Sequence, residues 1–463
     1  MSFVGLSPEE ERTMLARIGV ERFEDLLEAV PAELRQRQPL PVAGPLSEIE
    51  QRRQFGAWSR MNHADRAVSF MGGGIYDHYI PAAVNALAMR SEFATAYTPY
   101  QPEVAQGTLT AIFEFQSMIA ELAGMEVANA SLYDGATATV EAALLARHHT
   151  GRARVLASAS LHPHTLEVLR TYLGAERVAV IAAPEGVSDA AALERALAPD
   201  VACVIYAQPS FFGLVERPDA IHRAAHAAGA LAIAACDPIA LVVLEPPGAQ
   251  NADGSAGADI VVGEGQSLGN APTLGGPALG FFACRQALVR RMPGRLAAET
   301  VDRHGRRGFV LTLQTREQHI RREKATSNIC TNQALVALMV NIFLNVYGKV
   351  GLRELAKQNL AKAAYAAEQF GKHANILFSR APRFNEFVVQ TTEDPYVINS
   401  RLLGHKLVGG LALKKFYPEL GHAALWCCTE MTTRTAIDTA VGVLAESEAE
   451  EPSGERTVEE VVR

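Results

Sequence analysis

Short apolar runs alternate with amphipathic segments through the middle of the chain. The runs are rich in valine, isoleucine and alanine, and they predict buried strands at 154–157, 178–181, 202–206, 231–235 and 259–262. Apolar residues at helical spacing between them predict helices at 164–173, 189–197 and 218–228. Strand and helix in alternation favour an α/β domain, with a mostly parallel sheet covered on both faces and a site at the strand ends.

The same patterns extend to both ends of the chain. Helices are predicted at 102–123, where Gly124 is placed as the C-terminal cap, and at 136–147 after a turn. Ser7-Pro8-Glu9-Glu10 has the form of a capping box, so 1–65 is predicted to be a helical arm that packs on its own body or on a partner. The large α/β domain is placed at 66–300.

After about residue 295 the pattern changes to long helices with few strands. Helices are predicted at 335–347, 352–373 and 438–444, with strands at 387–389 and 412–413. We therefore expect a small α+β domain at 301–446. An acidic, mobile tail is expected at 447–463.

Composition narrows the class of protein. The chain has 463 residues, 48% of them hydrophobic and 20% charged, and a net charge of −8, which disfavours a nucleic-acid binder. No apolar run reaches the length of a membrane span, and the first residues lack the features of a secretory signal. The six cysteines form no CxxC pair, so we expect a soluble, cytoplasmic protein.

The most informative stretch, 258–280, reads ADIVVGEGQSLGNAPTLGGPALG. In enzymes that use pyridoxal phosphate, a strand-to-loop turn of this kind carries the lysine that holds the cofactor as a Schiff base. Here the turn reads Gly265-Gln266-Ser267-Leu268, and no lysine precedes Lys324. A covalently held cofactor in the sheet domain is therefore not expected.

Other residues resemble the remaining parts of such a site. Asp134, Gly135 and Thr137 begin a helix whose N-terminus is suited to a phosphate, although Asp134 can equally be an ordinary helix cap. Asp237 follows a predicted strand at the position of a carboxylate that pairs with the pyridinium nitrogen. A carboxylate in that place also commonly caps the next turn. Together these residues suggest the remnant of a pyridoxal phosphate site.

Three long strings carry a resemblance to a known family. They are AYTPYQPEVAQG at 96–107, NASLYDGATA at 129–138 and IRREKATSNICTNQ at 320–333. The chain resembles the α (N-terminal) subunit of the two-chain glycine decarboxylase, the P-protein of the glycine cleavage system, from about Phe70 to Val443. The resemblance implies the large domain of a fold-type I pyridoxal phosphate enzyme.

The resemblance also implies partners and an activity. In that family the β subunit bears the lysine and the pyridoxal phosphate, and two copies of each chain form an α2β2 heterotetramer. The complex decarboxylates glycine and passes the aminomethyl group to the lipoyl arm of H-protein. This chain alone is then expected to be inactive.

Two groups of residues are candidates for completing the partner's site. Tyr97, Thr98 and Tyr100 concentrate hydroxyl groups in a proline-stiffened loop, where the alternative is ordinary interface packing. Thr326 and Ser327 follow basic residues suited to a phosphate, and the match to the family favours a role near the partner's cofactor. A solvated helix end is the alternative.

Two other functions stay open at this point. One is a self-sufficient pyridoxal phosphate enzyme that uses Lys324. The other is a structural or regulatory pseudoenzyme whose residues never touch substrate. No metal site is predicted, because His222 and His226 have the spacing of a zinc pair but lack a third ligand.

Overall fold

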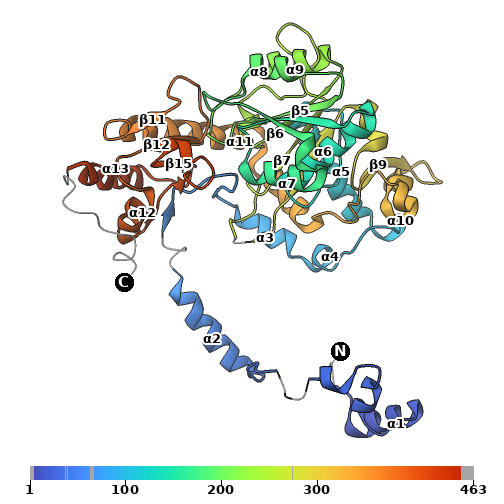
Figure 1. Ribbon diagram of the computed structural model, residues 1–463. Coiled ribbons are helices and arrows are strands. Elements are labelled where there is room, and N and C mark those ends of the chain that lie inside the picture. The colour runs from blue at the N-terminus through green and yellow to red at the C-terminus, as the bar shows by residue number, and fades with distance from the viewer. Residues whose placement is uncertain (1–4, 37, 39, 63–66, 274, 450–463) are drawn as a thin grey trace. The chain divides into compact units, whose positions relative to one another are not determined.

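The computed structural model describes residues 5–449, except positions 37, 39, 63–66 and 274 and the side chains of 447–449 (Figure 1). The chain divides into two compact units, Met1–His63 and Ala64–Arg463. The predicted boundary at 65/66 falls on residues outside the described set. So does the predicted acidic tail, apart from its first three positions, which belong to the last helix.

The first unit contains two helices, α1 (Pro8–Ile18) and α2 (Glu48–Met61), joined by short 3-10 turns. The predicted capping box is confirmed. The N–H of Glu10 donates to Ser7 Oγ at 3.2 Å, and the N–H of Ser7 donates to the Glu10 carboxylate at 2.8 Å. Leu15 is the only buried side chain on α1 among the described residues.

A seven-stranded sheet forms the centre of the second unit, in the order β2-β8-β7-β6-β5-β3-β4. Its strands are β2 (Val127–Ala128), β3 (Arg154–Ser158), β4 (Val178–Ile181), β5 (Val201–Gln208), β6 (Leu231–Cys236), β7 (Ile260–Glu264) and β8 (Gly280–Cys284). β3 to β7 pair in parallel, whereas β8 is antiparallel to β7 and β2 is antiparallel to β8. The five predicted strands are confirmed, and the two antiparallel strands are additional.

Helices cover both faces of this sheet. Side chains alternate between the two faces along each strand, so each face presents apolar residues that helices can cover. On β6, Ala232 and Ala234 face one hydrophobic cluster, whereas Ile233 faces the other. The first cluster includes residues of α5 (Gln106–Ala123), α8 (Ala190–Ala196) and α9 (Pro218–Ala227). The second includes residues of α6 (Gly135–Thr150) and α7 (Pro163–Leu173).

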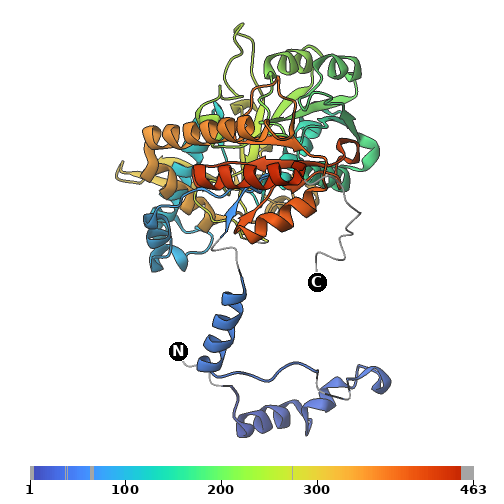
Figure 2. The same ribbon diagram turned by 90° about the vertical axis from the view of Figure 1, so that its left-hand side faces the viewer.

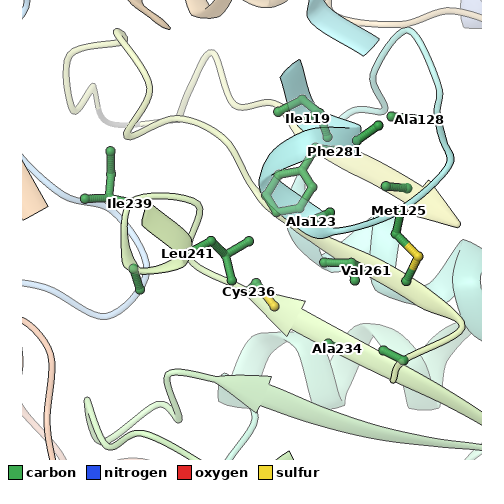
Figure 3. Close-up of a cluster of buried hydrophobic side chains, with 14 of the residues drawn as sticks. Ile119, Ala123, Met125, Ala128, Ala234, Cys236, Ile239, Leu241, Val261 and Phe281 are labelled. Atoms are coloured by element: carbon green, nitrogen blue, oxygen red, sulfur yellow. The ribbon is translucent and has the colours of Figure 1, made fainter. Parts of the chain in front are cut away.

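Figure 3 shows part of the first cluster. Ile119 and Ala123 on α5 lie over Ala234 of β6, Val261 of β7 and Phe281 of β8. Small residues on the strands let the helix approach the sheet closely, and the large side chain of Phe281 fills the remaining space. This packing fixes the ends of β6 and β7, where the candidate site lies.

The longest helix, α11 (Ala334–Phe370), runs from the large domain into the C-terminal part of the chain (Figures 1 and 2). The sequence predicts two helices here. Both are present, and a kink at Gly348, with φ 59° and ψ 179°, separates them within α11. α11 is long and apolar enough to cross a membrane by length and composition. It contacts α3 (Ala82–Ala88) and α5, and several of its side chains, Val336, Val340 and Phe343 among them, are buried in the first hydrophobic cluster.

The C-terminal part contains a four-stranded antiparallel sheet in the order β11-β12-β15-β14. Its strands are β11 (Asn375–Leu377), β12 (Glu386–Gln390), β14 (Leu411–Ala412) and β15 (Ala423–Cys427). α13 (Arg434–Ala449) lies beside the end of α11 and contacts α12 (Pro395–Gly404), and Figure 2 shows α11 and α13 side by side. The remaining strands are the pair β1 (Val68–Ser69) and β13 (Leu407–Val408), and the hairpin β9 (Leu296–Val301) and β10 (Arg307–Thr312).

Candidate functional site

A cavity of about 550 Å³ opens at the carboxyl ends of the parallel strands. The N-terminus of α6 and the loop after β1 line it, and β12 of the C-terminal sheet contributes one carboxylate. Its acidic residues are Asp134, Asp237, Glu264 and Glu386. Among the described residues that line the cavity there is no lysine or arginine. The cavity is therefore acidic.

Glu264, the last residue of β7, is bound by backbone N–H groups. Its carboxylate accepts from Gly135 at 3.0 Å, from Gln266 at 2.9 Å and from Leu279 at 2.8 Å. Burial raises the pKa of Glu264 to about 7, against the lowering effect of these donors. A carboxylate of the chain itself thus occupies the N-terminus of α6.

Asp134 caps the same helix. Its carboxylate accepts from the N–H of Thr137 at 2.8 Å, and the hydroxyl of Thr137 accepts from the N–H of Asp134 at 3.3 Å. Asp134, Gly135 and Thr137 are therefore brought together as the sequence predicts. The groups of Gly135 and Thr137 that could bind a phosphate are engaged by carboxylates.

Asp237 and Glu386 face the cavity from opposite domains. Asp237 Oδ1 accepts from the N–H of Ile239 at 2.9 Å, whereas its buried Oδ2 has no hydrogen-bond partner, and burial raises its pKa. Glu386 accepts from the N–H of Gly73 at 2.6 Å and from the hydroxyl of Tyr76 at 2.8 Å. Burial raises the pKa of Glu386 to about 7, and Asp237 adds to the shift.

Gln266 lies in the turn where a Schiff-base lysine is otherwise expected. It is 2% exposed, and its side-chain amide pairs with the backbone of Tyr76, accepting at 3.1 Å and donating at 3.2 Å. Lys324 is exposed on a short turn, and it is not among the residues that line the cavity. None of the described residues that line the cavity carries an amine that could bond an aldehyde.

His162 is one of two histidines that line this cavity, the other being His164. His162 Nε2 lies 2.9 Å from the carbonyl oxygen of Gly73. Burial, with a further contribution from His164, lowers the pKa of His162 to about 4. The lowered pKa means that the His162 imidazole adds no positive charge to this cavity at neutral pH.

These observations test whether the cavity fits pyridoxal phosphate. The unpaired Oδ2 of Asp237 fits a pyridinium nitrogen. A phosphate at α6 would meet the charges of Glu264 and Asp134, and the aldehyde would find no lysine. The cavity of this chain does not fit the covalently held cofactor.

The tyrosine loop lines a second, smaller cavity of about 170 Å³. Tyr97 and Thr98 line it together with Arg295 at the start of the β9 hairpin. Tyr97 is 85% exposed, whereas the hydroxyl of Tyr100 accepts a 3.4 Å hydrogen bond from Arg295. Arg295 therefore shares this cavity with Tyr97 and Thr98 and is hydrogen-bonded to Tyr100.

Thr326 and Ser327 lie elsewhere, since neither lines either cavity. The Ser327 hydroxyl hydrogen-bonds to Glu141 of α6 and accepts from the N–H of Ile329 at 3.0 Å. Glu141 is 6% exposed, and burial raises its pKa to about 7.

Several site residues were not predicted from the sequence: Tyr76, His162, Glu264, Glu386 and Arg295. Glu264 ends β7 and lies two residues after the strand predicted at 259–262, so the position of that strand indicated where to look. Glu386 comes from β12, far along the chain, and nothing in the local pattern places it near Gly73.

The fold is that of the fold-type I pyridoxal phosphate enzymes. Apo mouse CSAD matches this chain with a TM-score of 0.65 at 15% identity, covering 96% of this chain and 92% of that one. At that identity the likeness shows the fold. The predicted fold class is confirmed.

The chain belongs to the glycine cleavage system P-protein family, whose model matches residues 1–444. A relative in Desulfitobacterium hafniense is 48% identical over 450 residues, covering 96% of this chain and 100% of the relative. Another in Koribacter versatilis is 46% identical over 452 residues, with coverage of 96% and 100%. Both are named probable glycine dehydrogenase (decarboxylating) subunit 1.

A solved structure agrees with this assignment. The crystal structure of glycine decarboxylase (P-protein) of the glycine cleavage system, in inhibitor-bound form, is 41% identical and has a TM-score of 0.85. The match covers 96% of this chain and 100% of that one. The family resemblance predicted from the sequence is confirmed.

Proposed function

We propose that this chain is the α subunit of a two-chain glycine decarboxylase. With a β subunit it decarboxylates glycine and delivers the aminomethyl group to the lipoyl arm of H-protein. Full-length similarity to proteins named subunit 1 supports the assignment. The observation that carries it is the sheet-end cavity: its described lining residues include no lysine, and Glu264 binds the N-terminus of α6 there.

Pyridoxal phosphate is held by the β subunit in this proposal. When bound there, its ring accepts the electron pair that the departing carbon dioxide leaves behind. The α chain supplies the fold that pairs with the β subunit, in an α2β2 heterotetramer with two-fold symmetry. The complex acts in the cytoplasm. This agrees with the six free cysteines, of which Cys330 is exposed.

Tyr97, Thr98 and Tyr100 contribute to the partner's site. Tyr97 is exposed on its loop, so it is available to a second chain, whereas a residue buried in its own domain is not. Thr326 and Ser327 are proposed to approach the partner's cofactor. Asp134, Gly135, Thr137 and Asp237 are the remnant of a cofactor site in this chain.

The test is a complex assembled with α chains that carry Tyr97→Phe and Tyr100→Phe together. Each change removes one hydroxyl and keeps the ring. We expect normal assembly and a loss of glycine decarboxylation of at least about tenfold. Tyr172→Phe, at an exposed tyrosine on α7, is the matched control and should keep full activity.

Each rival function gives a different result. Full activity of the double variant in a normal tetramer would favour the structural or regulatory pseudoenzyme. Turnover by the α chain alone, lost in Lys324→Ala, would favour the self-sufficient enzyme. The exposed position of Lys324, outside the cavity, opposes that second possibility.

A further inference from the structure

Arg295 is a buried cation without an anion. The residue is 5% exposed, and in the described part of the chain its guanidinium donates only to neutral acceptors. Nη1 donates to Asn332 Oδ1 at 3.2 Å, Nη2 donates to the hydroxyl of Tyr100 at 3.4 Å, and the buried Nε has no partner. A buried charge is costly unless it is paired, so this arrangement calls for a counter-ion.

A neighbouring arginine shows what a purely structural role looks like. Arg316 is 8% exposed, and its guanidinium donates to the carbonyl oxygens of Leu313 at 3.1 Å, Gly294 at 3.0 Å and Met292. Backbone carbonyls surround Arg316, whereas Arg295 has two long hydrogen bonds. The two arginines are buried to a similar extent, but the hydrogen-bond donors of Arg316 are satisfied and those of Arg295 are not.

Arg295 also faces an open space. It lines the 170 Å³ cavity together with the polar residues Tyr97, Thr98, Thr331 and Asn332, and no acidic residue is among the described residues that line it. Asn332 is held in turn, because its amide Nδ2 donates to the carbonyl oxygen of Ala130 at 2.9 Å. The Tyr100 ring lies 5.8 Å from the guanidinium carbon and adds a cation–π contact.

We propose that this cavity is a binding site for a small monocarboxylate, with Arg295 as the group that recognises it. A guanidinium matches a carboxylate with parallel N–H donors. One negative charge neutralises the one cation, whereas a doubly charged phosphate would leave a buried excess charge. The cavity holds a molecule of only a few non-hydrogen atoms. Glycine belongs to this class, and naming it rests on the function proposed above.

The site holds the carboxylate rather than reacting with it. An ion pair that persists into the transition state binds substrate and transition state alike, so it lowers KM without raising kcat. Arg295 is therefore a binding residue, whose loss affects KM for glycine more than kcat.

The direct test is a calorimetric titration of the full chain with acetate. We expect saturable binding by the native chain, with a Kd of the order of 1 mM for so small a ligand. Arg295→Gln should weaken it at least about tenfold. Arg223, on α9, forms an exposed ion pair with Asp253. Arg223→Gln removes the same charge there and should leave acetate binding unchanged.

Arg295→Lys keeps the test decisive if the glutamine variant does not fold. It retains the charge but loses the planar fork, so we expect intermediate affinity. Acetate binding that is equal in all variants, or absent from the native chain, would overturn the proposal. Inorganic phosphate that binds more tightly than acetate through Arg295 would also overturn it.

The complex with the β subunit gives the second readout. In Arg295→Gln, KM for glycine should rise about tenfold while kcat changes by less than about threefold. An unchanged KM would remove glycine as the ligand. A native complex that does not decarboxylate glycine would refute the proposed function, and the acetate titration would still decide the site.

Discussion

The carboxylate of Glu264 accepts a 3.0 Å hydrogen bond from the backbone N–H of Gly135, at the N-terminus of helix α6. Two further N–H groups, from Gln266 and Leu279, donate to the same carboxylate. One side chain thus joins the end of β7, the loop after it and the start of α6. It also fills the position at which a helix N-terminus otherwise receives an anion.

Glu264→Ala should therefore destabilise the protein. The change leaves three N–H groups without their acceptor, and water in the cavity can replace only part of that bonding. We expect a loss of about 2 kcal/mol in the free energy of unfolding, measured by urea denaturation. Glu194→Ala, at an exposed glutamate on α8, is the control and should change stability by less than about 0.5 kcal/mol. Equal effects would show that the Glu264 contacts contribute nothing.

The full chain mixed with pyridoxal phosphate and reduced with borohydride should form no covalent adduct in the sheet-end cavity. The described residues that line the cavity include no lysine. Peptide mapping by mass spectrometry checks the outcome, and the β subunit treated in the same way is the positive control. A stoichiometric adduct at Lys324 would contradict the expectation and favour a self-sufficient enzyme.

Glu141 should make stability fall as pH rises. Burial raises its pKa from the ordinary 4.5 to about 7. Below about pH 4.5 the carboxyl is protonated in both the folded and the unfolded chain. Between 4.5 and 7 the unfolded chain ionises first, so the free energy of unfolding falls.

The shift corresponds to ~3 kcal/mol across that pH range. Glu141→Gln removes this contribution, so the stability difference between pH 5 and pH 8 should change by about that amount relative to the native chain. Urea denaturation at both pH values measures it. Glu194→Gln, at the exposed control site, should leave the pH dependence of stability unchanged. If Glu141→Gln also left it unchanged, the raised pKa of Glu141 would be refuted.

Gly348→Ala should destabilise α11 through the backbone alone. Gly348 has φ 59° and ψ 179°, a region that only glycine adopts readily, and a Cβ added there would have no atom within 4 Å. We expect a cost of about 1–3 kcal/mol in thermal or urea unfolding. Gly442→Ala on α13 also meets open space but has ordinary helical geometry, so it should stabilise the protein by about 0.5–1 kcal/mol.

The sequence pattern predicts the parallel part of the sheet well, because each strand is an apolar run bounded by turn residues. β8 was not predicted, since its run, Gly280–Cys284, follows a glycine-rich loop that masks its start. The two predicted helices within α11 were correct in extent. The kink at Gly348 that separates them is a single backbone conformation, which no hydrophobic pattern records.

The candidate site was predictable only where it is local. Asp134, Gly135 and Thr137 meet because they share one helix turn, so their spacing was sufficient. Glu386 reaches Gly73 across 313 positions of sequence, and Arg295 meets Tyr100 across 195. Such contacts arise from the packing of domains and loops, which periodicity and propensity do not encode.

The hydrogen bond between Glu264 and Gly135 also affects how the N-terminus of α6 can bind dissolved anions. Because β7 and α6 belong to one rigid domain, the carboxylate meets the Gly135 N–H at an effective concentration far above that of any dissolved anion. A phosphate ester in solution would have to displace an intramolecular competitor that is never diluted. The contact that joins β7 to α6 therefore also lowers the affinity of the α6 N-terminus for dissolved anions.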